Sequence, residues 1–430
     1  MRLLKTIFDA IVTVYTKALF IYSLYYIMLS LFGFIRIKSK KKFEPEKSFA
    51  LVVAAHNEET VIENIVHSLI NLDYPRELYD IFVIADNCTD NTATLARNAG
   101  AIVYERTNKE KKGKGYALEW MFGKIFEMER KYDAVVIFDA DNLASKQFLK
   151  EMNNKLCEGF EVVQGYLDSK NPNDTWITGS YSISFWTSNR MFQNARSNLR
   201  LSSQLGGTGF CIATETLKEL GWGATCLTED LEFTCKLVLN GRRVGWAHEA
   251  VIYDEKPLTL SQSWWQRKRW MQGFADVATR YFWKLIKRAV TKFDFVALDC
   301  AIYSIQPIIT IVAGFGVFMN LIQKFVGYTK VFANLGDYLS QFNADVFLNF
   351  NLINIGALFV LIMQFIYTPL VLALEKKLSF KILLYYLVYP VYVLTWIPIS
   401  VMGVIDKDKE EWCHTTHTRS VSINELEKAN

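Results

Sequence analysis

The sequence of 430 residues predicts an α/β domain inserted between membrane-spanning helices, in a multi-pass membrane protein. Apolar runs that end at polar residues alternate with helix-like segments in the first half of the chain, a pattern typical of a doubly wound parallel sheet. Long hydrophobic blocks flank this region on both sides. In total, 51% of the residues are hydrophobic, which is high for a soluble protein.

The first hydrophobic block occupies residues 11–34 and contains Lys17 as its only charge. It is about long enough to cross a bilayer, and it lacks the small-residue cleavage site of a signal peptide. We therefore expect residues 1–35 to form an N-terminal transmembrane helix. Basic residues are concentrated in the next segment, 36–42. The positive-inside rule then places the following region in the cytosol, at the plasma membrane.

Residues 48–255 are predicted to form the cytosolic α/β domain. Short apolar runs rich in β-branched residues indicate buried strands, and the segments between them have helical periodicity. The expected strands are 49–54, 79–85, 134–138 and 161–163, and the expected helices are 59–70, 91–98 and 116–129.

The strand at 134–138 runs directly into Asp139 and Asp141. In open α/β sheets the ligand binds beyond the carboxyl ends of the strands, and alternate residues point the same way, so both carboxylates can face one ligand. Two hard oxygen ligands with open positions suit Mg²⁺ or Mn²⁺ bridging to a diphosphate. Taken alone, an Asp-x-Asp is also compatible with a solvated acidic turn.

Two more polar turns follow predicted strands. His56, Asn57 and Glu58 come after the first strand, and Asp86 ends the second. Such turns present backbone N–H groups and short polar side chains to a nucleotide, although helix capping explains the acidic residues equally well. Lys114 lies in a run of lysines and glycines that can approach phosphates closely, and a solvated basic loop is the alternative.

Two motifs later in the chain combine charge with aromatic surface. Glu229 and Asp230 open an amphipathic helix, where a carboxylate is stabilised as the anion and is ready to accept a proton. A capping arrangement built on Thr228 is the alternative. Arg269 beside Trp270 offers a phosphate-binding fork and a flat face on which a sugar can stack. A membrane-interface helix would carry the same residues.

The C-terminal half is predicted to lie along and within the membrane. Residues 256–294 have the Trp-, Arg- and Lys-rich pattern of interfacial amphipathic helices. Pro390 and Pro398 should kink or divide the last of the hydrophobic blocks that follow. Residues 406–430 form a tail. The transmembrane channel region is expected at 295–405, with blocks at 295–322, 346–374 and 382–405.

Composition excludes several classes of protein. The net charge of +4 is mild and no dense basic run is present, so a nucleic-acid partner is not expected. The seven cysteines are scattered without metal-type spacing, which indicates reduced thiols in a cytosol-facing protein.

The order and spacing of these motifs resemble those of the membrane-embedded family 2 glycosyltransferases, the processive inverting synthases of cellulose, chitin, hyaluronan and poly-N-acetylglucosamine. The resemblance covers residues 48–270 by motif and the flanking spans by layout, and it implies a GT-A (Rossmann-like) fold. The motifs that carry it are His56-Asn57-Glu58, Asp86, Asp139-x-Asp141, Thr228-Glu229-Asp230 and Gln266-x-x-Arg269-Trp270.

The resemblance also implies a role for each motif. Asp86 and the His56-Asn57-Glu58 turn would hold uridine, and Lys114 would approach the nucleotide. Asp139 and Asp141 would hold the metal and the diphosphate of a UDP-sugar. Asp230 would be the general base. The growing chain and the pyrophosphate would be bound by Glu229, Gln266, Arg269 and Trp270. An acceptor-facing switch loop would be formed by Gly206-Gly207-Thr208-Gly209-Phe210-Cys211, although cellulose synthases have a different sequence there.

The C-terminal segment resembles the short gating segment that closes over UDP in hyaluronan- and poly-N-acetylglucosamine-type synthases. One span before the α/β domain and three after it would leave this tail on the other side of the membrane, away from UDP. Either the tail does not gate, or one hydrophobic block, with the block that contains Pro390 and Pro398 as the first candidate, is a hairpin or does not cross. The implied gating residues are Trp412, Thr415, Thr418 and Arg419.

The leading hypothesis is a processive inverting transferase that makes a β-glucan, cellulose-like or mixed-linkage, from UDP-glucose and moves it across the membrane. Membrane lipids and export partners in the cell envelope are then expected. One alternative is a poly- or oligo-N-acetylglucosamine synthase that uses UDP-GlcNAc, and another is a non-processive transferase that adds one sugar to a lipid. A transporter or inactive scaffold would belong to a different class.

Overall fold

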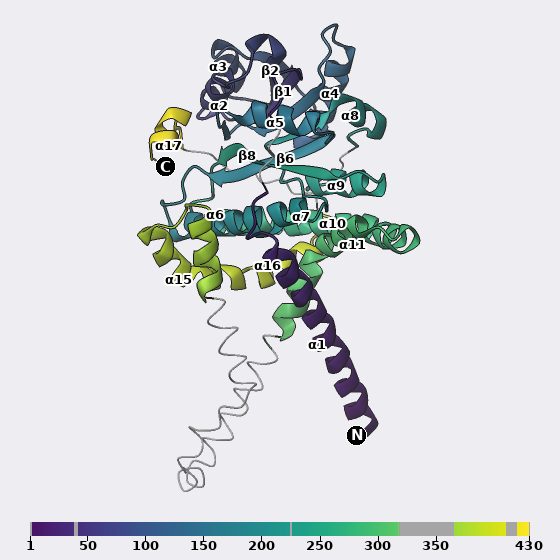
Figure 1. Cartoon of the computed structure of the whole chain (residues 1–430). Coiled ribbons are helices and arrows are strands. Elements are labelled where there is room, and N and C mark those ends of the chain that lie inside the picture. Colours follow the sequence, from purple (N-terminus) through teal and green to yellow (C-terminus); the bar gives the residue numbers. More distant parts are fainter. Residues whose placement is uncertain are drawn as a thin grey trace.

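The computed structural model describes residues 2–37, 42–223, 226–316, 318, 365–409 and 419–429. Figure 1 shows an α/β domain, a layer of helices beneath it, and a long N-terminal helix that extends away from that layer. This N-terminal helix is α1 (Arg2–Leu31).

One eight-stranded sheet organises the α/β domain, in the order β3-β2-β1-β4-β7-β6-β8-β5. Strands β3, β2, β1 and β4, which are neighbours in this order, are parallel to one another. Strand β7 is antiparallel to both of its neighbours, β8 is parallel to β6, and β5 is antiparallel to β8. The bounds are β1 Phe49–Ala55, β2 Tyr79–Asp86, β3 Ile102–Arg106, β4 Ala134–Asp139, β5 Leu143–Ala144, β6 Val162–Ser169, β7 Phe210–Ala213 and β8 Val244–Asp254.

The prediction of a wholly parallel sheet is therefore wrong at β5 and β7. Ala134 at the start of β4 pairs with Ala213 at the end of β7, and Ile137 pairs with Phe210. Because β7 runs against β4, the residues just before it, 206–209, reach the carboxyl end of β4. The antiparallel strand thus brings a glycine-rich loop to the edge of the sheet where ligands bind in α/β folds.

Helices cover both faces of the sheet, since successive strand residues alternate between two hydrophobic cores. Leu51 and Val53 of β1 belong to one core, with α2, α3 and α5, while Ala50 and Val52 belong to the other, with α4, α8 and α9. These helices are α2 Ile62–Ile70, α3 Thr92–Asn98, α4 Lys114–Glu127, α5 Phe148–Cys157, α8 Thr214–Leu220 and α9 Glu229–Leu239, and a short 3-10 turn, η1, spans Arg76–Leu78.

A layer of helices lies beneath the domain (Figure 1). Its longest member, α10, has 33 residues and packs against α16, where a Cβ on Gly403 would lie 2.4 Å from the Cβ of Met271. Only glycine allows this approach. The elements of the layer are α6 Trp176–Ser188, the π-helical turn η2 Asn189–Asn194, α7 Ala195–Asn198, α10 Leu260–Lys292, α11 Phe295–Ser304, α15 Phe380–Leu394 and α16 Trp396–Ile405.

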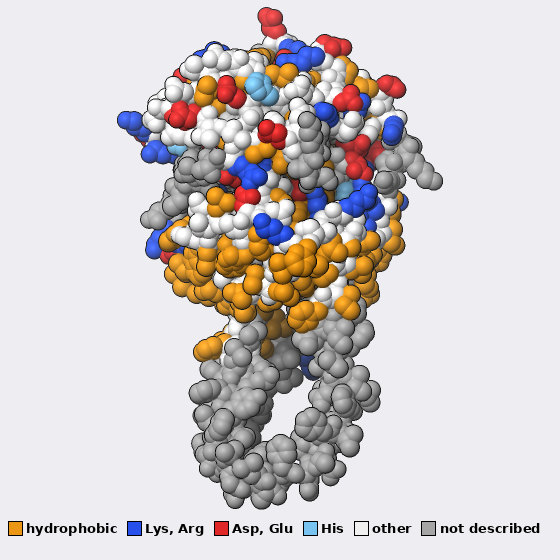
Figure 2. Space-filling view, turned by 90° about the vertical axis from the view of Figure 1, so that its left-hand side faces the viewer, with side chains coloured by type: hydrophobic (Ala, Val, Ile, Leu, Met, Phe, Trp, Pro, Cys, Tyr) orange, Lys and Arg blue, Asp and Glu red, His pale blue; other side chains and the backbone are white. Residues whose placement is uncertain are grey.

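Apolar side chains form a band around the lower part of the molecule in Figure 2. Exposed aromatic residues of the helical layer include Trp283, Phe293, Phe295 and Phe380. In water such a surface would be unfavourable, so its extent fits contact with lipid.

Among the described residues, one helix is long and apolar enough to cross a membrane, Phe380–Ile405, and there are two if the bent pair Phe295–Ser304 and Gln306–Gly316 is a single span. The apolar part of α1, Lys17–Leu31, is shorter than a full span. Most of the expected block at 295–322 lies within the described residues, whereas most of the block at 346–374 lies outside them. The predicted multi-pass layout therefore remains a prediction. Within this span, α15 and α16 meet at Thr395, three residues before Pro398, whereas Pro390 lies inside α15.

The tail ends in a short helix, α17 (Ile423–Ala429), that lies on the α/β domain (Figure 1). Ile423 and Leu426 are buried against Leu143 of β5, and the Asn64 amide of α2 donates a 2.8 Å hydrogen bond to the hydroxyl of Ser420. The end of the chain thus lies on the same side as the α/β domain. Three of the expected gating residues, Trp412, Thr415 and Thr418, fall outside the described residues.

Candidate active site

The turn after β4 holds Asp139 and Asp141 in fixed positions. The backbone N–H of Asp139 donates to Asn142 Oδ1 at 3.1 Å and to Thr208 Oγ1 at 3.0 Å. Asp141 Oδ2 accepts the backbone N–H of Glu255 at 3.0 Å, and its Oδ1 accepts the Asn142 amide at 3.1 Å. Asp141 is only 7% exposed. A solvated acidic turn is therefore not what this motif forms.

Lys114, the first residue of α4, lies at the centre of the site. Its ammonium pairs with Asp139, donates to the carbonyl oxygen of Gly207 at 2.6 Å, and lies 4.0 Å from a carboxylate oxygen of Glu229. The lysine thus connects the end of β4, the loop before β7 and the start of α9. The alternative of a solvated basic loop does not hold for Lys114, although it describes the exposed Lys111.

Asp230 lies in the first turn of α9, next to the same glycine loop. A Cβ on Gly207, whose φ is +81°, would lie 3.5 Å from Asp230 Oδ2. Burial and, next, the negative charge of Glu229 raise the pKa of Asp230 to about 7. Burial also raises the pKa of Glu229, against the opposing effect of the Lys114 ammonium. A carboxylate with a pKa near neutrality is suited to accept a proton and release it again.

The capping interpretation of this motif is not observed, since the side chain of Thr228 makes no capping hydrogen bond to α9. Thr228 instead packs against Gly273 of α10, where a Cβ would lie 2.4 Å from its Oγ1 and 2.5 Å from its Cγ2. This close approach brings the start of α9 against the helix that carries Gln266, Arg269 and Trp270.

The turns after β1 and β2 join into one surface. His56 Nδ1 lies 2.7 Å from the carbonyl oxygen of Asp86, and Asn57 Oδ1 accepts the backbone N–H of Thr89 at 2.8 Å. The backbone N–H of Glu58 donates to Thr92 Oγ1 at 2.8 Å. The predicted nucleotide-binding residues are thus brought together by direct contacts between the two turns.

Arg106, which sequence reasoning missed, orients Asp86. Arg106 ends β3, is 6% exposed, and forms an ion pair with the Asp86 carboxylate. Its other guanidinium nitrogen donates to the carbonyl oxygen of Lys111 at 2.7 Å. A charged residue at the end of a strand beside Asp86 was the signal that could have revealed this partner. Near the start of α3, Asp90 Oδ1 accepts the backbone N–H of Thr92 at 3.0 Å, whereas the Asn87 side chain bonds to Asp86 and to the backbone of Asn108.

The motif on α10 faces the site on one side and the surface on the other. The Tyr181 hydroxyl donates to Gln266 Oε1 at 2.8 Å. Trp270 lies nearly parallel to Trp396 of α16, with ring centroids 6.4 Å apart. Trp265 is 50% exposed, as a residue at a membrane interface would be. The exposed Trp265 agrees with an interfacial helix, and the binding of phosphate or sugar by Arg269 and Trp270 stays a prediction.

Phe210 and Cys211 correct the prediction of an acceptor-facing loop. They are 1% and 0% exposed and belong to the two cores of the sheet, so they cannot contact an acceptor. The earlier part of the predicted loop, residues 206–209, lies beside Lys114 and Asp230, and the buried amide of Gln164 supports it. Gln164 Oε1 accepts the backbone N–H of Gly206 at 2.9 Å, and its Nε2 donates to the carbonyl oxygen of Thr208 at 3.0 Å.

The donor set at the end of β4 fits a hard divalent cation. Within the described parts of the chain, no three His, Cys, Asp or Glu side chains converge to enclose a metal by themselves. Asp139 and Asp141 provide two carboxylates, and Mg²⁺ and Mn²⁺ commonly take their remaining ligands from substrate phosphates and water. Asp141 is oriented by Asn142 and the backbone of Glu255, as expected of a ligating carboxylate.

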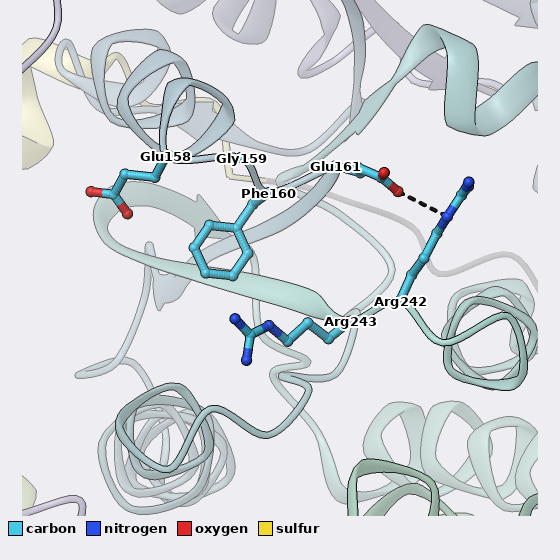
Figure 3. Close-up of a pocket in the computed structure, with 6 residues that line it drawn as sticks. All are labelled: Glu158, Gly159, Phe160, Glu161, Arg242 and Arg243. Atoms are coloured by element: carbon cyan, nitrogen blue, oxygen red, sulfur yellow. Dashed lines mark ion pairs between the residues drawn. The ribbon is translucent and has the colours of Figure 1, made fainter. Parts of the chain in front are cut away.

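A pocket at the other end of the sheet has no comparable chemistry. Figure 3 shows its lining residues, which come from the segments that precede β6 and β8. Arg242 pairs with Glu161 at 3.1 Å, and the guanidinium of Arg243 lies 5.5 Å from the ring centroid of Phe160. Because its charged groups are used in these contacts, we place the reaction at the carboxyl ends of the strands.

Three bacterial proteins are similar to part of the chain. It is 27% identical over 256 residues to the Bacillus subtilis protein described as probable glycosyltransferase YdaM, covering 56% of this chain and 59% of that protein. It is 28% identical over 240 residues to a beta-monoglucosyldiacylglycerol synthase of Synechocystis, covering 53% and 48%. It is 24% identical over 285 residues to a poly-beta-1,6-N-acetyl-D-glucosamine synthase of Staphylococcus epidermidis, covering 62% and 64%. The chain thus spans about half to two thirds of the length of these relatives.

The fold is also similar to that of a solved structure. The mannosyltransferase PcManGT from Pyrobaculum calidifontis, in complex with GDP-Man and Mn²⁺, superposes with a TM-score of 0.58 at 19% identity, over 93% of this chain and 99% of that one. Residues 45–273, which contain every motif of the site from His56 to Trp270, match the family described as Glycosyltransferase like family 2. With its GT-A-like fold and its paired carboxylates, the chain is a member of glycosyltransferase family 2.

Proposed function

We propose that the protein is an inverting glycosyltransferase that takes a sugar from a UDP-sugar and joins it through a β-linkage to a hydroxyl of its acceptor. The observation that carries this proposal is the position of Asp230. This half-buried carboxylate lies beside the glycine loop that contacts Lys114, which in turn pairs with Asp139. A candidate base and the Lys114 ammonium, a candidate partner of the leaving diphosphate, thus both lie beside Gly207.

The reaction requires one proton transfer and one displacement. Asp230 accepts the proton of the acceptor hydroxyl, whose oxygen forms a bond to the anomeric carbon while the bond from that carbon to the UDP oxygen breaks. Because the base acts from the side opposite the leaving group, an α-linked donor gives a β-linked product. Mg²⁺ or Mn²⁺, held by Asp139 and Asp141, would neutralise charge on the departing diphosphate. Lys114 and Arg269 supply further positive charge there.

We assign uridine to the surface formed by the turns after β1 and β2. Asp86, oriented by Arg106, would accept hydrogen bonds from the base or ribose. The direct contacts between the His56 and Asp86 turns keep this surface in place without a ligand, which lowers the entropic cost of binding.

The acceptor would reach Asp230 along α10. Trp270 and Trp396 offer flat faces, and Tyr181 positions the Gln266 amide. Sugars stack on such faces, so we propose that the enzyme elongates a β-linked polysaccharide, with a β-glucan from UDP-glucose as the first expectation. The relatives that make poly-beta-1,6-N-acetyl-D-glucosamine keep UDP-GlcNAc as the alternative donor.

Transfer of one sugar to a lipid is the second candidate function. The exposed apolar band over the helical layer is the observation that favours it, because such a surface would place a lipid hydroxyl near the site. Relatives described as beta-monoglucosyldiacylglycerol synthases agree with it. In either case we propose that the protein is bound to the plasma membrane with its α/β domain in the cytosol.

The position of α17 bears on the topology. Since the tail returns to the side of the α/β domain, we propose an even number of membrane crossings between that domain and Asp406, in place of three. Arg419 then remains a candidate gating residue, because its side chain pairs with Asp174 and its backbone N–H donates to Glu255 Oε2 at 3.2 Å.

The test is release of UDP by the purified full chain in detergent with Mg²⁺ or Mn²⁺ and a panel of UDP-sugars. Products would be separated into polymer and lipid-extractable fractions and digested with linkage-specific glycanases. A polymer from UDP-glucose that β-glucanases cut would support the leading proposal. A single glucosyl group on lipid would support the second candidate, and turnover only with UDP-GlcNAc would change the donor. No turnover with any UDP-sugar would contradict the proposal.

A further inference from the structure

Lys170 is a buried cation that the proposed reaction has not yet used. It follows directly after β6, and the residue is only 2% exposed. Its ammonium nitrogen is buried and has no hydrogen-bond partner among the described residues. Burial of an ammonium without a hydrogen-bonding partner is expensive, and natural proteins rarely retain such a group without a role for it.

The backbone holds Lys170 in this position. Its N–H donates to the carbonyl oxygen of Asp254 at 2.8 Å. The next residue, Asn171, makes two hydrogen bonds of 2.9 Å through its side-chain amide, to the backbone N–H and to the carbonyl oxygen of Lys256. The start of the segment after β6 is therefore fastened to the end of β8, and the side chain cannot reach solvent by a small movement of the loop.

Backbone contacts place Lys170 near the Asp-x-Asp motif, because its N–H donates to Asp254 and the N–H of the next residue, Glu255, donates to Asp141 Oδ2. Burial lowers the pKa of its ammonium, and the charges that oppose this effect are Asp141 first, then Glu255 and Asp254. Each of these carboxylates has another partner. Asp254 pairs with Lys256 at 2.7 Å. Asp141 Oδ2 accepts the backbone N–H of Glu255, and the Glu255 carboxylate accepts the backbone N–H of Arg419.

We propose that Lys170 binds the diphosphate of the nucleotide from the Asp141 side of the site, as Lys114 does from the Asp139 side. This assignment rests on the proposed use of a UDP-sugar. A diphosphate bound beside Asp141 would give the Lys170 ammonium the hydrogen-bonding partner that it lacks among the described residues. The free protein then carries an unfavourable buried charge that ligand binding relieves, so Lys170 contributes to affinity and not to folding.

This energetic pattern separates a ligand-binding lysine from a structural one. Lys170→Met preserves much of the side-chain length and removes the charge. Without ligand, its melting temperature should equal or exceed that of the wild type, because the desolvated ammonium is gone. With Mn²⁺ present, its affinity for UDP should fall about 10- to 100-fold, as expected for loss of a hydrogen bond to a charged group. Its affinity for uridine, which has no phosphate, should not change.

Lys256→Met is the matched control. Lys256 is also buried, at 3% exposure, but it already pairs with Asp254 and lies 3.5 Å from the ring centroid of Phe185. Without ligand, Lys256→Met should lower the melting temperature, whereas Lys170→Met should not lower it.

Binding would be measured by calorimetry on the full chain in detergent, with UDP and uridine as probes. Loss of UDP affinity at unchanged uridine affinity and undiminished melting temperature would support the assignment. Wild-type affinity for UDP in Lys170→Met would overturn it, and so would a variant that fails to fold or melts earlier, since either result indicates a structural counter-charge. A wild type that binds no UDP would refute the proposed donor and, with it, the assignment.

Discussion

The contact between Gly273 and Thr228 makes a strong prediction about how α10 positions the site. In Gly273→Ala the new methyl group would lie 2.4 Å from Thr228 Oγ1, 2.5 Å from Cγ2 and 2.8 Å from Cβ. Ordinary contacts begin near 3.4 Å, so the two segments must separate by about 1 Å. The clash involves a β-branched side chain held close to the backbone, which cannot swing away as a long flexible one could.

The expected magnitudes follow from that separation. Overpacking of this kind costs about 1–3 kcal/mol. Replacing glycine by alanine within a helix returns about 1 kcal/mol, so the net loss of stability should be about 0–2 kcal/mol. Catalysis should suffer more, because Thr228 directly precedes Glu229 and Asp230. A displacement of about 1 Å between base and substrate can reduce the rate by about 100-fold.

The assay is UDP release at saturating donor, with thermal melting in the same detergent. Gly123→Ala is the control, since Gly123 also lies in a helix and a Cβ there would meet nothing within 4 Å. This control should be slightly stabilised and fully active. Adding Thr228→Ala to Gly273→Ala removes two of the three clashing atoms and should restore part of the stability. If Gly273→Ala behaves like Gly123→Ala, the reasoning about this contact is refuted.

Four further predictions test other parts of the mechanism and fold. Because burial and Glu229 raise the pKa of Asp230 to about 7, the rate of UDP release should rise with pH through neutrality and then level off, whereas a flat pH profile would contradict the role of a base. The native protein keeps the Asp230 proton at pH values where the unfolded chain releases it, so the stability of the fold should decrease as the pH rises from about 4 to 7. Thermal melts across this range test this decrease, and Asp230→Asn should lose this pH dependence of the melting temperature. Chelation with EDTA should abolish UDP release and added Mn²⁺ should restore it, and full activity in EDTA would argue against a metal at Asp139 and Asp141. Ile423→Asp, which buries a charge against Leu143, should release α17, so that limited proteolysis removes the tail first while the α/β domain stays intact.

The regular part of the fold could be predicted because its pattern is local. The apolar runs at β1, β2 and β4 end at polar residues in the sequence, and all three strands extend one residue beyond the prediction. The direction of β7 could not be predicted in the same way. Its four residues, Phe210–Ala213, form an apolar run that fits either direction. Which way it pairs depends on the path of the chain through α6 and α7, which no local pattern records.

The site residues also fall into two groups, those that a local sequence pattern reveals and those that depend on tertiary structure. Carboxylates at strand ends and at the start of α9 could be predicted, because strand and helix ends leave such groups facing a ligand. Arg106 was visible only as a charged residue at the end of a strand, and Gln164 and Lys170 could not be predicted, because their burial is set by the tertiary structure. The error at Phe210 and Cys211 has the same origin, since burial in the sheet becomes visible only once β7 is placed between β4 and β6.

The most direct test of the central claim compares wild type with Asp230→Asn, using an α-linked UDP-sugar and Mn²⁺. The account predicts that both proteins bind UDP equally and melt at similar temperatures, while only the wild type releases UDP and forms a product whose new linkage is β by NMR. Asp230→Asn should be slower by about 1,000-fold or more, within the range that general-base catalysis contributes together with positioning. Release of UDP by Asp230→Asn at the wild-type rate, or an α-linked product from the wild type, would contradict the account.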